Sequence, residues 1–282
     1  MRNATRLLQI AAALCIVVLA AVLIAVFAAP KRTAEAPGRD GLSVAAERET
    51  REETPAPAPQ EPSVPPEPAP IGEPEAEPAP AVTVPEELAD ALAAAGIEPG
   101  ALTCAQLLAV ESAGSEGTLR AYETADGRSW TEALAPVACW VGKNGVSAAK
   151  TEGDKMTPAG LFALGTAFGI EPKPETGLAY RSVTADSYWV DDTDSPYYNQ
   201  WVEGGKGKTF RSGEHLIDCT PQYELAVVIE YNTADPVPGA GSAIFLHCGE
   251  QYTSGCVAVA HDDLVALLRW LDADKAPAIL IR

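Results

Sequence analysis

A segment of low complexity limits how much of this chain can fold. Residues 30–85 consist mainly of Pro, Ala and Glu and contain almost no aromatic or bulky aliphatic side chains. Such a segment cannot bury enough apolar surface to offset the entropy lost on folding, so we expect a disordered linker. Proline favours the extended polyproline II conformation, at about 3.1 Å per residue, so the linker can span on the order of 100 Å.

An apolar run precedes this linker. Residues 7–29 are hydrophobic except for Gln9, and about 20 apolar residues are enough for a helix to cross a bilayer. We therefore expect residues 1–29 to form a membrane-anchoring helix, with the rest of the chain on the extracytoplasmic side, in the cell wall or periplasm. A cleavable signal segment is the alternative, although the apolar core of a signal peptide normally has only about 7–15 residues.

The remaining residues, 86–282, are numerous enough for one domain with a hydrophobic core. Short apolar runs separated by Gly, Asp and Ser predict a mainly β domain, and two segments have the apolar spacing of a helix. The predicted strands are 107–110, 118–122, 130–141, 161–164, 224–231, 243–247, 257–259 and 279–281, and the predicted helices are 86–95 and 261–271.

The charge balance excludes one class of partner. The chain has 39 acidic and 20 basic residues and a net charge of −19, so its field repels nucleic-acid phosphates. No basic stripe or zinc-finger spacing is present. We therefore expect no nucleic acid as a partner.

The cysteines are not arranged as metal ligands. The chain has six of them and no C-x-x-C pair, which argues against a metal site, and nothing in the sequence indicates a cofactor. An extracytoplasmic domain allows disulfides, and Cys104 with Cys139 or Cys219 with Cys248 are conceivable pairs. The alternative for each is a small buried hydrophobic residue.

One pair of residues suggests an enzyme. His247 ends a predicted strand and Cys256 precedes the next one, so the loop between them can bring the imidazole and the thiol together. A cysteine thiol with a pKa of about 8.5 needs a neighbouring base or positive charge to become an effective nucleophile. Gly255 would let a substrate carbonyl approach the backbone amides near the thiol. The alternative is two half-buried residues near a turn.

The segment from Gln106 to the C-terminus resembles the catalytic domain of the YkuD-like L,D-transpeptidases of bacterial cell walls. The resemblance is carried by several motifs spread along the domain. They are residues 141–145, 152–160, 189–199, 214–216, 226–229, 241–247 and 254–257. It implies a β-sandwich or barrel with a C-terminal helix.

In that family a cysteine is acylated by a peptidoglycan stem peptide, with loss of D-Ala, and the acyl group passes to an amine of a second stem. By matching position, the resemblance implies that Cys256 is the nucleophile and His247 the base, with Ser254 and Gly255 in the backbone lining of the oxyanion site. Many members carry His before the glycine and Arg two residues after the cysteine. This chain has Ser254 and Ala258 there, a Gly-Cys-Val-Ala form that we associate with one branch of the family.

Other residues are candidates for substrate contacts. His215 lies in a motif that the resemblance covers and is a candidate for lining the substrate groove, with a structural hydrogen bond as the alternative. The aromatic rings of Trp189 and Tyr198 suit sugars or the aliphatic parts of stem peptides, unless they form a small core of their own. We expect Lys143, Lys150 and Lys155 to be solvated surface charges, with contact between one of them and a stem carboxylate as the alternative. His261 lies at a predicted helix start beside two aspartates, which favours a capping role over catalysis.

The sequence therefore predicts an L,D-transpeptidase that acts on peptidoglycan stem peptides through a thioester. Two alternatives remain, namely an L,D-carboxypeptidase, in which water accepts the acyl group, and a non-catalytic cell-wall-binding module. A cysteine protease is a weaker alternative, because the usual surroundings of such nucleophiles are missing. The sequence does not indicate an oligomeric state.

Overall fold

The computed structural model describes residues 81–282. The expected membrane anchor at residues 1–29, and residues 30–80 of the expected linker, lie outside the described residues. None of the helices within residues 81–282 has the length and apolar character needed to span a bilayer.

Most of the secondary structure in the described residues is β. Two α-helices are present, α2 (Glu86–Ala94) and α3 (His261–Trp270), with the 3-10 turns η1 (Pro99–Ala101), η2 (Leu216–Asp218) and η3 (Ala273–Lys275). The longer strands are β1 (Gln106–Ala113), β2 (Glu116–Thr124), β3 (Trp130–Trp140) and β6 (Gly160–Gly169). The shorter strands are β4 (Val146–Ser147), β5 (Thr157–Pro158), β7 (Tyr180–Ser182), β8 (Ser187–Val190), β9 (Trp201–Glu203), β10 (Gly213–His215), β11 (Ala226–Ile229), β12 (Phe245–Cys248), β13 (Val257–Val259) and β14 (Ala278–Ile281).

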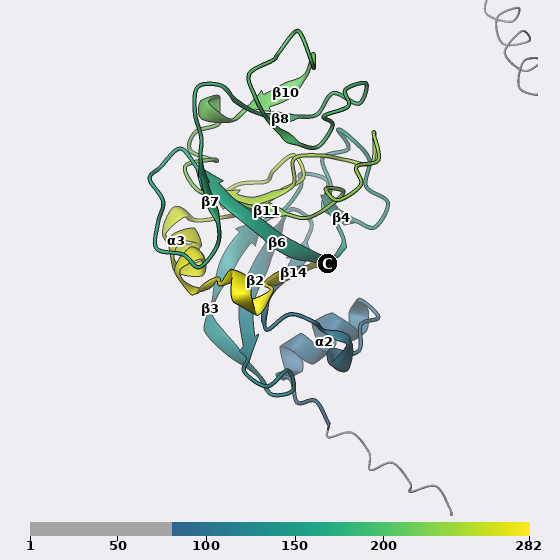
Figure 1. Ribbon diagram of the computed structural model, residues 1–282. Helices are drawn as coiled ribbons and strands as arrows, with labels where there is room; N and C mark the ends of the chain where they lie inside the picture. Colours follow the sequence, from purple (N-terminus) through teal and green to yellow (C-terminus); the bar gives the residue numbers. More distant parts are fainter. Residues whose placement is uncertain (1–80) are drawn as a thin grey trace, which may run out of the picture. The chain divides into compact units, whose positions relative to one another are not determined.

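The main sheet curls until it closes on itself. Its nine strands run in the order β11-β12-β13-β3-β2-β1-β14-β6-β7, and β11 also pairs with β6. This second pairing closes every strand except β7 into a barrel (Figure 1). Closure leaves few open sheet edges. The result confirms the predicted mainly β domain with a helix near its C-terminus.

Strand β1 is buried on both faces, because side chains alternate between the two sides of a strand. Leu108 joins the main core, where Leu264 of helix α3 also packs. Leu107 points the other way and joins a second cluster with Leu88 of helix α2. The two helices therefore cover opposite sides of the sheet, which explains why β1 reads as a nearly continuous apolar run.

Strand β12 divides its side chains in the same way, and this division builds the site. Leu246 and Cys248 belong to the main core. Phe245 points to the other face and belongs to a third cluster, which also contains Trp189 and Cys256. The small sheet β10-β8-β9 contributes Trp189 to this cluster.

The cysteines within the described residues are all free thiols. Cys104 lies in the cluster under helix α2, whereas Cys139 and Cys248 lie in the main core. Cys219 is half-buried beside the third cluster. The two conceivable disulfides are therefore absent from residues 81–282, and three of these cysteines act as small buried hydrophobic residues.

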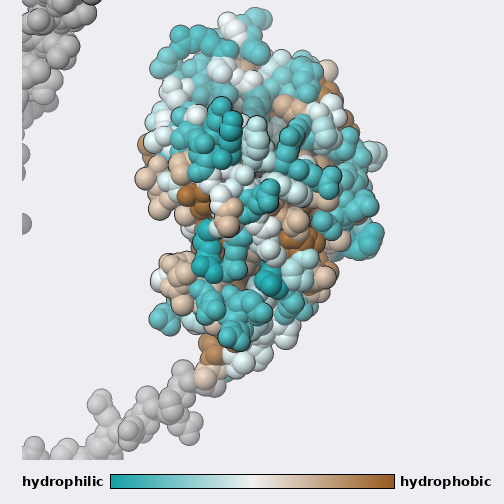
Figure 2. Space-filling model, turned by 180° about the vertical axis from the view of Figure 1, so that it is seen from behind, coloured by the Kyte–Doolittle hydropathy of each residue, from teal (hydrophilic) through white to brown (hydrophobic). Residues whose placement is uncertain are grey.

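One face of the described residues can be followed by its hydropathy. The face shown in Figure 2 is mainly hydrophilic, with apolar residues in small separate patches. Such scattered patches are normal for a folded domain.

Candidate active site

Cys256 lies at the end of the loop that connects β12 to β13. These two strands run parallel, with Leu246 beside Val257, so Cys256 comes to lie next to the start of β12. Its Sγ donates a hydrogen bond to the Ala243 carbonyl at 3.2 Å and accepts one from the Phe245 amide at 3.4 Å. The residue is 7% exposed. The backbone at the start of β12 thus fixes the position of the thiol.

His247 lies on the same face of β12 as Phe245. Its Nδ1 is 2.8 Å from the Cys248 carbonyl. Because a carbonyl only accepts, Nδ1 carries the proton of the neutral ring and Nε2 keeps a free lone pair. His247 and Cys256 line one cavity of about 380 Å³, so the structure brings the predicted pair together. No hydrogen bond joins their side chains among residues 81–282.

Burial keeps both groups of this pair neutral. Burial, with a smaller contribution from the nearby Glu214 carboxylate, raises the pKa of Cys256 to about 12. It lowers the pKa of His247 to about 4, because a charged imidazole is poorly solvated there. Cys256 is therefore a neutral thiol in the resting protein, not a thiolate. The thiol needs a base at the moment of attack, and His247 is available in its basic form.

Two threonine hydroxyls, which sequence reasoning missed, hold the cysteine loop. Those of Thr253 and Thr157 donate to the Cys256 carbonyl at 2.7 and 3.0 Å. Thr253 also accepts the Gly255 amide at 3.0 Å. The amides of Ser254 and Cys256 have no acceptor among the residues that the structure describes. These two amides, rather than that of Gly255, remain free for an oxyanion.

The conformation of Gly255 disfavours a side chain. Its φ is 154°, and a Cβ there would lie 3.2 Å from both Ile244 Cδ1 and the Met156 carbonyl oxygen. The same Cβ would lie 3.4 Å from Lys150 Nζ. Glycine is favoured here because L-residues rarely adopt this conformation and because a Cβ would fit only if the surrounding atoms moved by a few tenths of an ångström.

A second cavity, of about 210 Å³, lies on the other side of the thiol. Cys256, Ser254 and Glu214 line both cavities, whereas Lys150 lines only this second one. The expectation that Lys150 is a solvated surface charge is wrong. Its side chain is 3% exposed and forms an ion pair with Asp154 at 2.7 Å.

Trp189 supports the site from behind. Its indole Nε1 donates to the side-chain oxygen of Asn199 at 2.8 Å, and the same oxygen accepts the Ala243 amide at 3.0 Å. The Trp189 ring also packs edge-on against Phe245, with 4.9 Å between ring centroids. Trp189 is buried and lines neither of these two cavities, but it lines a separate cavity of about 270 Å³ together with Asn199. At the thiol its role is to support the site, and Asn199 is a residue that sequence reasoning did not single out.

Tyr198 also stands behind the cavity wall. Its hydroxyl donates to the Glu152 carboxylate and accepts the Gly241 amide at 3.1 Å. Glu152 lines the smaller cavity, but Tyr198 lines neither of the two. We expected Tyr198 to contact a substrate. Instead, its hydroxyl positions the Glu152 carboxylate.

His215 points away from the thiol. Its Nδ1 is 2.7 Å from Asp218 Oδ2, its Nε2 is 2.7 Å from the Ala185 carbonyl, and its ring stacks on Tyr188 with 4.4 Å between centroids. Its neighbour Glu214 faces the other way and lines both cavities. The structure therefore favours the structural hydrogen bond over the substrate contact for His215, because consecutive side chains of strand β10 point to opposite faces.

Ala258 lies beside His247 in the pairing of β13 with β12 and is fully buried. A Cβ on Gly249 would lie 3.3 Å from the Cβ of Ala258. The backbone on this side of the strand is therefore close, and the packing has no space for the arginine that many relatives carry.

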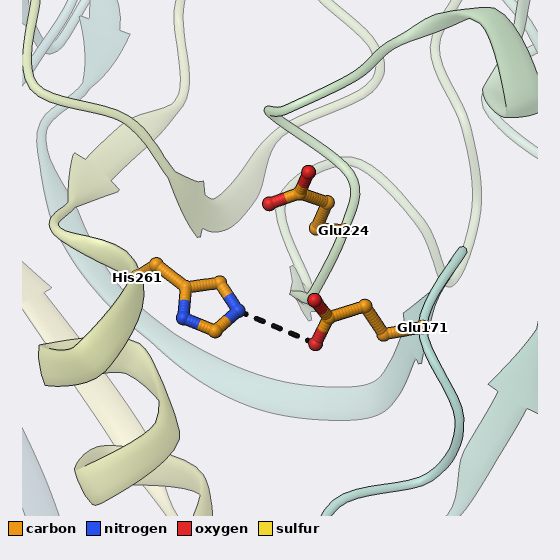
Figure 3. Close-up of side chains that lie close together, drawn as sticks. All are labelled: Glu171, Glu224 and His261. Atoms are coloured by element: carbon orange, nitrogen blue, oxygen red, sulfur yellow. Dashed lines mark hydrogen bonds and ion pairs between the residues drawn. The ribbon is translucent and has the colours of Figure 1, made fainter.

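His261, at the start of helix α3, lies outside both cavities. With Glu171 and Glu224 it forms a group whose ligand atoms lie within 4.8 Å of one another, and its Nε2 is 3.3 Å from Glu171 (Figure 3). Imidazole and carboxylate are ligand types that zinc accepts. All three side chains are partly exposed, and the ion pair accounts for the position of His261.

Comparison with known proteins agrees with this geometry. The model of the YkuD family, described as an L,D-transpeptidase catalytic domain, matches residues 115–279, which is more than half of the chain. No curated protein matches the chain. The matched span contains the thiol, the imidazole and the strands that hold them, and enzymes of this family are cysteine-dependent transpeptidases that act on peptidoglycan stem peptides. The chain therefore belongs to the YkuD family of L,D-transpeptidase catalytic domains.

Proposed function

We propose that this chain is a peptidoglycan L,D-transpeptidase that forms cross-links through a thioester on Cys256. One observation carries the proposal: Cys256 and His247 line the same cavity, and the free Nε2 of His247 is available as a base. A buried neutral thiol beside a buried neutral imidazole suits proton transfer during attack.

The first half-reaction acylates the enzyme. The sulfur attacks the stem-peptide carbonyl carbon that precedes D-Ala, while Nε2 of His247 takes the thiol proton. The C–N bond then breaks, and His247 returns this proton to the departing amine of D-Ala. The amides of Ser254 and Cys256, which have no acceptor in residues 81–282, can donate to the oxyanion of the tetrahedral intermediate.

The second half-reaction transfers the acyl group. The neutral amine of a second stem attacks the thioester, a C–N bond forms and the C–S bond breaks. His247 takes one N–H proton from the amine and returns it to the sulfur, which restores the thiol. Water in place of the amine would give an L,D-carboxypeptidase.

Placement outside the cytoplasm is part of the proposal. It rests on the apolar run of residues 7–29 and on the Pro/Ala/Glu segment that follows, which together suit an anchored enzyme that works at a distance from its membrane. Fractionation of cells that produce the full chain, with protease added to intact cells, tests both points.

A muropeptide assay tests the reaction. The purified full-length protein is incubated with tetrapeptide muropeptides, and the products are identified by mass spectrometry. We expect cross-linked dimers and free D-Ala, and no product from Cys256→Ala. Tripeptides alone would indicate a carboxypeptidase. No products, together with no adduct on Cys256 after incubation with a thiol-reactive carbapenem, would indicate a binding module.

A further inference from the structure

Glu214 holds a position that the resemblance does not explain. It pairs with Trp189 in the register of β10 with β8, and Trp189 belongs to the cluster that contains Cys256. Glu214 and Cys256 line both cavities, whereas His247 lines only the larger one. The carboxylate therefore lies where the two cavities meet at the reacting sulfur.

Tyr223 fixes the carboxylate of Glu214. The Tyr223 hydroxyl donates to Glu214 Oε2. The ring is 5% exposed and is packed edge-on against Phe245 and His247, with centroid distances of 5.5 and 5.8 Å. The other oxygen of Glu214 accepts no hydrogen bond from a side chain or amide in residues 81–282. One oxygen is thus anchored and the other is available to a ligand.

The two cavities differ in charge. The larger cavity is lined by Glu214 and Glu250, with no Lys or Arg among its lining residues. The smaller cavity is lined by Lys150 and Lys155 together with Glu152, Asp191 and Glu214. Lys150 is already paired with Asp154, so Lys155 is the available cation of this cavity. A cation is therefore favoured in the larger cavity, and a ligand that carries carboxylates finds a cationic partner only in the smaller one.

The base determines which side the acceptor uses. An amine can attack the thioester only after losing a proton, and His247, the base, lines only the larger cavity. Alkyl amines arrive as ammonium ions at neutral pH, since their pKa is about 10.4. The acceptor therefore brings a positive charge into the cavity that has carboxylates and no cationic side chain.

We propose that Glu214 binds the ammonium group of the acceptor and so directs the thioester toward an amine instead of water. The free carboxylate oxygen accepts one N–H hydrogen bond and then takes the extra proton of the ammonium, which it passes to solvent. The neutral amine left behind attacks the thioester beside His247. This inference rests on the proposed transpeptidase function and assigns its acceptor specificity to one residue.

The state of the carboxyl agrees with this role. Burial raises the pKa of Glu214 to about 7, with the Tyr223 hydrogen bond lowering it and the carboxylates of Asp191 and Glu152 raising it. An arriving cation favours the ionised form. A carboxyl that exchanges its proton near neutral pH can accept one from an ammonium and release it again.

The test compares acceptors on the same acyl-enzyme. Full-length wild-type protein and Glu214→Gln are acylated with tetrapeptide muropeptide. The thioester is then divided between stem-peptide amine, water and hydroxylamine, which is uncharged at slightly alkaline pH. We expect Glu214→Gln to lower the ratio of dimer to tripeptide by about tenfold or more, through a higher KM for the acceptor, because a charged hydrogen bond is lost. Capture by hydroxylamine stays within about twofold of wild type.

Two further variants complete the design. Glu214→Asp keeps the charge and restores at least part of the dimer. Glu98→Gln removes an exposed charge that lies outside both cavities and changes the ratio by less than about threefold. The role of Glu214 is overturned if wild type and Glu214→Gln give the same ratio of dimer to tripeptide, or if Glu214→Gln lowers capture by hydroxylamine as much as it lowers dimer formation. Either result leaves the transpeptidase proposal intact. A wild-type enzyme that acylates and yields only tripeptide contradicts the transpeptidase proposal, and the role of Glu214 with it.

Discussion

The carbonyl of Ala243 accepts the thiol of Cys256 at 3.2 Å, so one backbone group determines where the nucleophile lies. Ala243 has a left-handed conformation, with φ of 54°, which a residue other than glycine adopts only when its surroundings hold it. Its amide is held by Asn199 at 3.0 Å. The position of the thiol therefore depends on a side chain that lies outside both cavities.

Asn199→Asp is expected to destabilise the fold. Asn199 Nδ2 donates to the carbonyls of Asn232 and Tyr231 at 2.6 and 3.1 Å, and an aspartate would point an oxygen at both. We expect a loss of about 3 kcal/mol in the free energy of unfolding, measured with urea. The exposed Asn144→Asp is the matched control, with a loss below about 1 kcal/mol. Equal losses would contradict the special role of Asn199.

The reactivity of Cys256 should report a protonated thiol. Because its pKa is raised to about 12, the thiolate fraction grows about tenfold per pH unit across the range from neutral pH to about pH 10. The rate of alkylation by iodoacetamide should rise by that factor without reaching a plateau. The Cys256→Ala variant, measured in parallel, gives the alkylation rate of the other cysteines, which is subtracted as background. A plateau near neutral pH would show a preformed thiolate and contradict this picture.

His247 should make the fold sensitive to acid. Its folded pKa of about 4 is below the ordinary value of 6.5, so between these values the unfolded state binds more protons and stability falls as the pH is lowered. The difference between the two pKa values predicts that the free energy of unfolding falls by about 3 kcal/mol, and that the decrease is complete below about pH 4. His247→Gln should flatten this part of the pH profile of thermal unfolding. An unchanged profile would place the acid sensitivity elsewhere.

Gly255→Ala should impair the site more than the fold. The added methyl group meets Ile244 and the Met156 carbonyl, and the backbone has an unfavourable φ. We expect acylation to slow by about a hundredfold or more, because the loop that carries the thiol must shift. Gly114→Ala has φ of 71° and no atom within 4 Å of the new Cβ, so it isolates the effect of backbone conformation. Similar losses of activity in both variants would argue against steric exclusion at Gly255.

Ala258→Arg should not restore the pattern of other family members. The residue is fully buried, and no acidic partner is paired with it in the described structure. We expect the free energy of unfolding to fall by about 3 kcal/mol or more, because the arginine would overpack the site and bury an unpaired charge. Thermal unfolding measures this. A variant that folds normally and gains activity would show that the site accommodates an arginine at position 258.

The sequence predicted the elements whose signals are local. Apolar runs located β1, β12 and β13, and the spacing of apolar residues located both helices, because each pattern reflects which face of one element is buried. The pairing of Cys256 with His247 followed from two adjacent strands and the loop between them. Barrel closure was not predictable in this way, because it depends on β11 meeting β6, far apart in the chain.

The substrate-facing residues were the hardest to assign. Trp189 and Tyr198 have the right chemistry for ligand contact, yet their polar atoms are satisfied by Asn199 and Glu152. Choosing Glu214 over His215 required knowing which face of strand β10 meets the thiol. With only three residues, this strand is too short to show the alternation of polar and apolar side chains that would identify that face. The roles of Thr157 and Thr253 depend on backbone geometry, which residue identity alone does not reveal.

The position of β14 has a consequence for how the protein is made. This last strand lies between β1 and β6, and its partners are the first long strand and the strand that closes the barrel (Figure 1). The barrel cannot close until residues 278–281 have left the ribosome, since they must be free to insert between these two strands. Deleting residues 278–281 would remove the strand that joins the two halves of the sheet.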